Sequence, residues 1–230
     1  MKQPQIIYED NHLLVLNKPV AMPCVPDKSK ALSLLDWAKL YIKKSRHKPG
    51  NAFVAVVHRL DRPVSGIVCF ALTSKAASRL SDQIRRHVFK KTYLAICQGK
   101  IKDKSGEINN WLLKDRKKNM VSLYKSKIDP KAKLATTKWE ILKQHGDLLL
   151  VKLEPITGRA HQLRAQIASI GAPILGDIKY GTGPHMKDGG IFLHAYELKF
   201  THPTQKKQLT FIANVPEKFK KYFSINQQLI

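Results

Sequence analysis

The chain has 230 residues, 43% hydrophobic and 25% charged, and its 41 Lys and Arg against 17 Asp and Glu give a net charge of +24. These figures exclude a disordered or collagen-like chain, because the apolar residues suffice for a core. Three scattered cysteines without a Cys-x-x-Cys pair exclude a disulfide framework and a zinc site of that spacing. No apolar run reaches the roughly 18 residues of a membrane helix, and acidic residues near the start do not suit a signal peptide, so we expect a cytoplasmic protein.

The apolar pattern predicts alternating strands and helices without a regular repeat. Short β-branched runs predict strands at 13–16, 54–57, 67–72, 93–97, 148–153, 191–194 and 209–213. Helical spacing predicts helices around Trp37, from about 75 to 87, and from 163 to 170 with Gly171 as the C-terminal cap. We therefore expect an α+β fold with a mixed, mainly antiparallel sheet and flanking helices. No linker or repeat divides the chain, so we expect one domain over residues 1–230, with a division into two lobes left open.

The charge predicts a polyanionic partner, and nucleic acid is the most abundant one in a cytoplasm. In the helix at 75–87 the basic residues, which include Arg85 and Arg86, fall largely outside the apolar stripe. Between 100 and 138 the cations are interleaved with Trp111 and Tyr124, and Trp139 follows, a composition that suits phosphate contacts plus base stacking. A hairpin with a solvated charged face and aromatic residues in the core is the alternative for this segment.

A polar loop from His58 to Gly66 lies between two apolar runs, where a rigid scaffold can hold a carboxylate in place. Within it Asp61 lies between Arg59 and Arg62, so we expect a neighbouring guanidinium to lower the pKa of the Asp61 carboxyl. An ionised carboxylate can act as a nucleophile or a base. On spacing alone, a structural ion pair or a turn residue remains the alternative.

A second polar cluster runs from Pro155 to Arg164, a turn containing glycine that leads into the predicted helix. Two arginines near a helix start, Arg159 and Arg164, indicate an anion site. Either arginine could contact a phosphate or pair with a carboxylate such as Asp61. The alternative is an ordinary basic helix start.

These motifs, taken in order, resemble the RluA family of RNA pseudouridine synthases over nearly the whole chain. The segments that carry the resemblance are Asn17-Lys18-Pro19, His58 to Gly66, Lys91-Thr92-Tyr93-Leu94-Ala95, Thr157 to Arg164, Gly171 to Asp177, Tyr180-Gly181, Leu193-His194-Ala195 and His202-Pro203. Several motifs in a fixed order are far more specific than one tetrapeptide.

The resemblance implies conversion of specific uridines in structured rRNA or tRNA to pseudouridine, without cofactor or metal, at a central cleft of the sheet. It implies that Asp61 is the catalytic carboxylate, that Arg164 is its ion-pair partner and that Tyr93 is the ring against the target base. Arg59 corresponds to the arginine that helps to fill the space left by a flipped nucleotide. Further residues expected to bind substrate are Arg62, Arg159, His161, Lys18, Arg85 and Arg86.

Several of these roles have a structural alternative. Lys18 either contacts RNA or supports the Asp61 loop, and the supporting role is favoured. For His58 and His161, a structural histidine with its hydrogen bonds made is more common than a general acid. We also expect a monomer, and a short family member without the N-terminal S4 domain.

Three residues depart from the family pattern. Val64 stands where the family has Thr, Ala160 where it has Thr or Ser, and Ala21 where it has Gly. These changes leave open, as the second hypothesis, a non-catalytic RNA-binding or ribosome-assembly factor on the same fold. A DNA-binding or base-excising enzyme is the third, but it explains the charge and not the ordered motifs.

Overall fold

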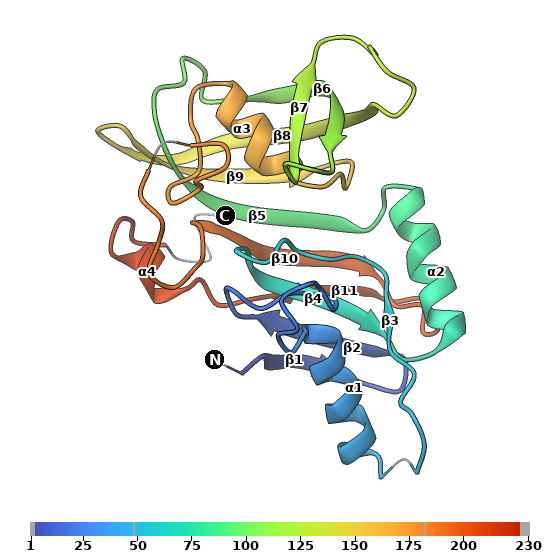
Figure 1. Cartoon of the computed structure of the whole chain (residues 1–230). Helices are drawn as coiled ribbons and strands as arrows, with labels where there is room; N and C mark the ends of the chain where they lie inside the picture. Colours follow the sequence, from blue (N-terminus) through green and yellow to red (C-terminus); the bar gives the residue numbers. More distant parts are fainter. Residues whose placement is uncertain (1–2, 48, 182, 226–230) are drawn as a thin grey trace. The chain divides into compact units, whose positions relative to one another are not determined.

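The computed structural model describes residues 3–47, 49–181 and 183–225, which form two compact units (Figure 1). The first unit contains the chain up to Phe89 together with Ala195–Asn214. The second contains Lys90–His194 and the residues from Val215 onward. Each unit is described by itself.

The first unit is built on antiparallel strands with two helices. Its strand order is β1-β2-β4-β10, with β3 paired to β4 and β11 paired to β10. The elements are β1 (Gln5–Glu9), β2 (Leu13–Lys18), α1 (Leu34–Ser45), β3 (Ala55–Val56), β4 (Ser65–Ala71), α2 (Ser74–Arg85), β10 (Leu193–Thr201, whose first two residues fall in the second unit) and β11 (Gln208–Ile212).

Strand β4 is the centre of this unit, because all seven of its residues are buried. One of its faces packs with β2 and with Ala76 and Leu80 of helix α2. Helix α2 begins at Thr73, whose hydroxyl accepts a hydrogen bond from the N–H of Ala76, and this cap fixes where the helix starts. A polar loop that joins β3 to β4 is therefore attached to the most deeply buried strand of the unit.

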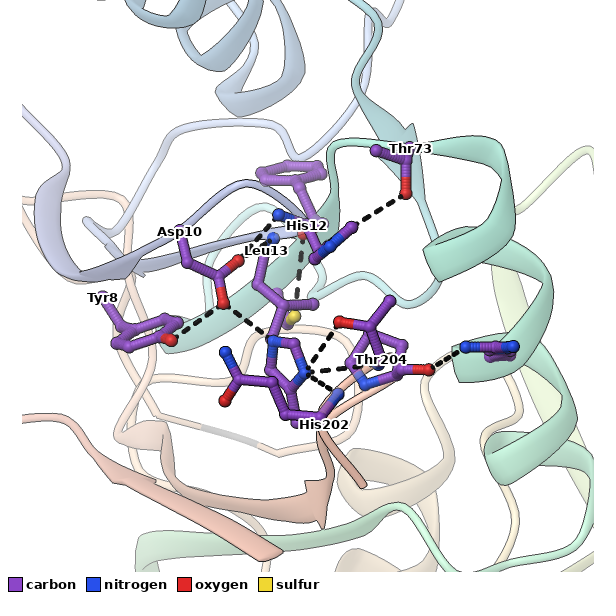
Figure 2. A network of polar contacts seen from close by, with 12 residues as sticks. Tyr8, Asp10, His12, Leu13, Thr73, His202 and Thr204 are labelled. Carbon is purple, nitrogen blue, oxygen red and sulfur yellow. Dashed lines mark hydrogen bonds and ion pairs between the residues drawn. The ribbon is translucent and has the colours of Figure 1, made fainter. Parts of the chain in front are cut away.

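The turn between β1 and β2 is held to the end of β10 by Asp10 (Figure 2). The Asp10 carboxylate accepts hydrogen bonds from the Tyr8 hydroxyl, from the backbone N–H groups of His12 and Leu13, and from Nε2 of the buried His202, all at 2.7–2.8 Å. Nδ1 of His202 accepts from backbone N–H groups of the next turn, so the Nε2 proton is the one shared with Asp10. Burial raises the pKa of Asp10, but the donors outweigh it and hold that pKa below its usual value.

The second unit has the strand order β5-β9-β8-β6-β7, and its described pairings are all antiparallel. Its elements are β5 (Lys90–Gln98), β6 (Ser105–Asp115), β7 (Met120–Tyr124), β8 (Lys133–His145), β9 (Leu148–Pro155), α3 (Gln162–Ser169) and α4 (Glu217–Lys220).

Helix α3 covers one face of β6, β7 and β8 (Figure 1). Ala165 of the helix packs there with Leu112, Val121 and Ala135 of the three strands. The helix ends at the predicted Gly171, which adopts a φ of +92° and donates its N–H to the Ala168 carbonyl. This left-handed conformation carries no steric cost for glycine, so the chain leaves the helix there.

The α+β class with mainly antiparallel strands is confirmed, and so are most of the predicted elements. Three predictions were inaccurate. The run 54–57 forms only the two-residue strand β3. The run 191–194 is a strand only from Leu193, and that strand continues to Thr201. Helix α2 ends at Arg85, two residues before its predicted end. Strands β1, β6, β7 and β8 were not predicted: β1 and β7 have only five residues each, and charged and polar residues interrupt the apolar pattern of β6 and β8.

Candidate active site

Asp61 lies on a turn between β3 and β4 in the first unit, and its side chain is partly exposed. Its backbone carbonyl accepts a hydrogen bond of 3.0 Å from the N–H of Val64, which closes a tight turn around Pro63. Arg59 and Arg62, on either side, are both exposed. The turn therefore presents a carboxylate between two cationic side chains at the surface of this unit.

The buried side chain of Lys18 supports this turn. This residue is fully buried, and its ammonium group donates hydrogen bonds to the carbonyls of Pro19 and Met22 at 2.9 Å and of Arg62 at 3.2 Å. Burial lowers the pKa of Lys18 to about 8, and the negative charge of nearby Asp61 acts in the opposite direction. Because all three ammonium protons are directed at carbonyls, the structure favours the supporting role of Lys18 over direct contact with RNA.

Two further contacts fix the ends of the loop. The N–H of Leu60 donates to Sγ of Cys24 at 3.2 Å, and the N–H of Cys69 in β4 donates to Nε2 of His58 at 2.9 Å. Burial raises the pKa of the Cys24 thiol, so this sulfur remains a neutral acceptor. His58 is 9% exposed, which agrees with a structural role for this histidine.

Two of the departures from the family pattern lie at this loop. Ala21 has a φ of +62°, and its carbonyl accepts a hydrogen bond of 2.9 Å from Nε of Arg62. Glycine adopts this left-handed conformation without strain, whereas an alanine there costs about 1 kcal/mol of stability. Val64 is 3% exposed, so its side chain is buried at the end of the turn.

The second polar cluster forms a rigid turn in the second unit. The side chain of Gln162 accepts hydrogen bonds from the Thr157 hydroxyl and the Arg159 N–H, and donates to the Thr136 carbonyl of β8, all within 2.8–3.0 Å. Nε of Arg159 donates to the Leu134 carbonyl at 3.0 Å while the residue stays exposed. The turn that precedes α3 is thus attached to β8 on one side and presents Arg159 to solvent.

Arg164 is buried and paired with Asp177. Its Nε and Nη2 atoms donate to the two oxygens of Asp177 at 2.6 and 2.8 Å, a bidentate pair whose side chains are 5% and 0% exposed. The guanidinium carbon also lies 5.4 Å from the centre of the Tyr180 ring. Since a planar guanidinium held in this way has little rotational freedom, its position is fixed before any substrate binds.

Tyr180 connects Arg164 to the remaining part of this cluster. Its hydroxyl accepts a hydrogen bond from the Val121 N–H and lies within hydrogen-bond distance, 2.8 Å, of Nδ1 of His161. His161 has a φ of +53° and caps no backbone group of α3 with its side chain. The side chain of His161 is partly exposed, and substrate binding by it stays a prediction.

Tyr93 and Lys91 lie on the same face of β5, because they are two residues apart in a strand. Tyr93 is 8% exposed and is paired in register with Leu153 of β9. The Lys91 ammonium lies 3.8 Å from the position where a side chain on Gly158 would begin. Burial lowers the pKa of Lys91 to about 8, a shift that the sequence did not predict.

The predicted RNA-binding cations differ in their surroundings. Arg85 and Arg86 are both highly exposed and both pair with Asp82 of the same helix. Trp139 is 7% exposed and packs against Gly106, so it belongs to the core. Trp111 and Tyr124 are partly buried, so Trp139 is a core residue as the hairpin interpretation expects, whereas the other two keep part of their rings exposed.

The sequence-predicted residues are divided between the two units: Asp61, Arg59, Arg62, Lys18, Arg85 and Arg86 in the first, and Tyr93, Arg159, His161 and Arg164 in the second. An ion pair between Asp61 and Arg164 stays a prediction. Asp177 and Tyr180 were missed as site residues. The signal was present in the Gly176-Asp177 and Tyr180-Gly181 motifs, because a buried arginine requires a carboxylate.

Within residues 3–47, 49–181 and 183–225, no group of three or more His, Cys, Asp or Glu side chains is placed to hold a metal ion. In the same part of the chain, no helix has both the length and the apolar character needed to cross a membrane.

Solved structures with a similar fold are pseudouridylate synthase domains. Human RNA pseudouridylate synthase domain containing 4 superposes with a TM-score of 0.77 at 23% identity, covering 94% of this chain and 90% of that one. Human RNA pseudouridylate synthase domain containing 1 superposes with a TM-score of 0.71 at 25% identity, covering 92% of this chain and 83% of that one. Both therefore share the fold over most of their length.

Sequence relatives agree with the fold. The dual-specificity RNA pseudouridine synthase RluA of Haemophilus influenzae is 38% identical over 216 residues, which are 90% of this chain and 91% of the relative. The ribosomal large subunit pseudouridine synthase C of Buchnera aphidicola is 32% identical over 225 residues, 94% of this chain and 68% of the relative. A family model described as RNA pseudouridylate synthase matches residues 12–169, a span that includes Asp61, Tyr93 and Arg164. The chain belongs to the RNA pseudouridylate synthase family.

Proposed function

We propose that this enzyme isomerises specific uridines in structured rRNA or tRNA to pseudouridine, and that Asp61 is its catalytic carboxylate. The observation that carries the proposal is the Asp61 turn itself, attached to the buried strand β4 and supported by the buried ammonium of Lys18. The names of the relatives support the substrate class, since one is a dual-specificity synthase and another acts on the large ribosomal subunit.

The reaction conserves every atom of the nucleotide. The bond between N1 and C1′ breaks, the uracil turns while it stays bound, C5 bonds to C1′, and the proton on C5 is lost while N1 gains one. A carboxylate can attack C1′, attack the base ring, or remove a proton from the ribose, and Asp61 suits each of these three routes. No cofactor is needed for the balance.

The other site residues have roles that follow from their chemistry. Arg164 is proposed as the cation that keeps Asp61 ionised once RNA excludes water, because a guanidinium does not titrate. Tyr93 is proposed as the ring against the detached uracil, which stacking holds by about 1 to 3 kcal/mol while leaving it able to turn in its plane. Since Tyr93 is 8% exposed, this stacking requires a local rearrangement when the nucleotide enters.

The exposed arginines are proposed to hold the RNA. Arg59 is expected to help fill the space that the everted nucleotide leaves, and Arg62 and Arg159 to contact phosphates. Extruding a base costs a few kcal/mol of lost stacking, which such phosphate contacts offset. We expect the chain to act in the cytoplasm, as a monomer, with residues 1–230 working as one catalytic domain.

Release of tritium from RNA labelled at C5 of uridine tests the proposal, because C5 loses its hydrogen only when the new carbon–carbon bond has formed. We expect Asp61→Asn to abolish the release while RNA binding persists, and Asp103→Asn, at an exposed aspartate far along the chain, to leave it unchanged. Normal release by the Asp61→Asn variant would refute the assignment. A wild-type chain that binds RNA but never releases tritium would instead support the non-catalytic RNA-binding factor.

A further inference from the structure

Two aromatic residues and a leucine form a row across the open face of β7, β6 and β8. Trp111 of β6 lies directly opposite Tyr124 of β7 and, on its other side, directly opposite Leu134 of β8. Residues directly opposite in neighbouring strands project to the same face of a sheet. Leu112 and Leu123, the next residues of that register, pack under α3, so the row projects to the other face. We call Tyr124, Trp111 and Leu134 the aromatic row.

The aromatic row is open to solvent and is not part of the core. Leu134 is 44% exposed, and Trp111 and Tyr124 are partly exposed. Single apolar residues at a surface are ordinary, but three in adjacent register positions form one continuous patch. Exposed apolar area of this kind does not stabilise the isolated domain, and this favours a binding surface.

Positive charge surrounds the aromatic row. The Lys127 ammonium lies 5.6 Å from the centre of the Trp111 ring, and Arg159 donates its Nε proton to the Leu134 carbonyl while remaining exposed. The loop from Lys125 to Lys133 adds exposed cations, with Asp129 as its single acidic residue: Lys125, Lys127, Lys131 and Lys133. A protein partner of this chain would have to be strongly acidic, whereas RNA supplies both the phosphates and the flat rings that such a surface fits.

We propose that the aromatic row binds a single-stranded segment of the RNA substrate, with a base stacked on Trp111 and the neighbouring phosphate on Lys127. The inference rests on the proposed function for the identity of the partner. The cation over an exposed ring is a weaker contact than a stacked base. A base therefore takes the ring face, and the Lys127 side chain, which is long and flexible, moves to the phosphate.

Fluorescence anisotropy tests the aromatic row with two probes: a labelled oligocytidine of about 12 nucleotides and a blunt RNA duplex of the same length. The oligocytidine contains no uridine, so its binding is measured independently of the isomerisation. We expect Trp111→Ala to weaken binding of the oligocytidine about tenfold and binding of the duplex less than about twofold, because a paired base cannot stack on the ring. Trp111→Phe keeps a ring and should restore most of the affinity.

The matched control is Trp37→Ala, which removes a partly exposed tryptophan that stacks on Tyr41 in the first unit. This variant should bind both probes as the wild type does. An unchanged affinity of Trp111→Ala for the oligocytidine, or an equal loss for both probes, would overturn the proposal.

Ultraviolet crosslinking of the wild-type chain to the oligocytidine gives a second test that no folding defect can obscure. The crosslinked peptides should contain Trp111 or Tyr124, and crosslinks confined to other segments would contradict the proposal. The tritium assay separates this inference from the proposed function. If Trp111→Ala loses oligocytidine binding and the wild type releases no tritium, the aromatic row is supported as an RNA-binding surface and the proposed isomerase activity is refuted.

Discussion

Lys18 is the residue on which the position of the Asp61 turn most directly depends. We predict that Lys18→Met destabilises the protein by about 2 to 3 kcal/mol, because the carbonyls of Pro19, Met22 and Arg62 lose their buried donor. Tritium release should fall in the same variant, since the turn loses its support. Urea unfolding measures the change in stability, and a stability equal to that of the wild type would contradict this account.

Because the pKa of Lys18 is lowered, the difference in stability between the wild type and Lys18→Met should depend on pH. The folded-state pKa is about 8, while an unfolded lysine titrates near 10.4, so between these values the unfolded chain binds more protons. The free energy of unfolding of the wild type should therefore rise, relative to Lys18→Met, as the pH increases from about 8 to about 10. Below pH 8 the difference should stay constant. A difference that stays constant or falls over this range would contradict a pKa lowered by burial.

Arg164 carries a charge that is already shared with Asp177. We predict that Asp177→Asn costs about 3 kcal/mol of stability, because it leaves a buried guanidinium without its carboxylate. The rate of tritium release should fall by more than the loss of folded protein explains, since the guanidinium is no longer held in one orientation. Tyr180→Phe, which keeps the ring under the guanidinium, should be milder. Full activity of a folded Asp177→Asn variant would show that the orientation of Arg164 is unimportant.

The site residues differ in how far the sequence could predict them. Asp61 and Arg164 were identified because they stand in ordered motifs, and Gly171 because a glycine after an apolar helix has few other roles. The partnership of Arg164 with Asp177 was not predicted, since the two residues stand thirteen positions apart, across the end of α3 and the loop after it, and only the fold brings their side chains to 2.6 Å. From the sequence, the supporting role of Lys18 could be favoured over RNA contact but not established, because a sequence does not show whether a lysine is buried.

At the scale of elements, continuous apolar runs predicted β2, β4, β5 and β9 well, because these strands are buried on both faces. Strands β6 and β8 were missed because one face of each is open to solvent and carries charged and polar residues. Helix α2 was predicted about two residues too long, since the spacing of Ile84 and Val88 continues past the point where the chain leaves the helix.

Gly66 shows how closely the elements of the first unit approach each other. A Cβ atom at this position would lie 2.2 Å from the carbonyl oxygen of Ala195 in β10, and the residue has a φ of +117°. We predict that Gly66→Ala costs more than about 3 kcal/mol, since both the backbone conformation and the strand spacing would have to change. Gly50→Ala is the control, because a Cβ there meets nothing within 4 Å. Equal thermal stability of the two variants would contradict the close approach.

At the scale of the whole molecule, the net charge of +24 predicts RNA binding that weakens steeply with salt. Arg85 and Arg86 of α2 each contact Asp82, but exposed ion pairs are weak, so both guanidinium groups can exchange this carboxylate for a phosphate. Reversing both charges with Arg85→Glu and Arg86→Glu should reduce the slope of log affinity against log salt by about 2. Asp82→Asn, which removes the competing carboxylate, should tighten binding slightly. An unchanged slope in the double variant would place the RNA away from α2.

The central claim is that a carboxylate at position 61 converts uridine to pseudouridine in cellular RNA. Mapping pseudouridine in total RNA from cells without the gene, and from the same cells carrying the wild-type or the Asp61→Asn chain, tests it most directly. The account predicts that defined rRNA or tRNA positions lose pseudouridine in the deletion, regain it with the wild type, and stay unmodified with Asp61→Asn. Identical maps in all three, or full restoration by Asp61→Asn, would contradict it.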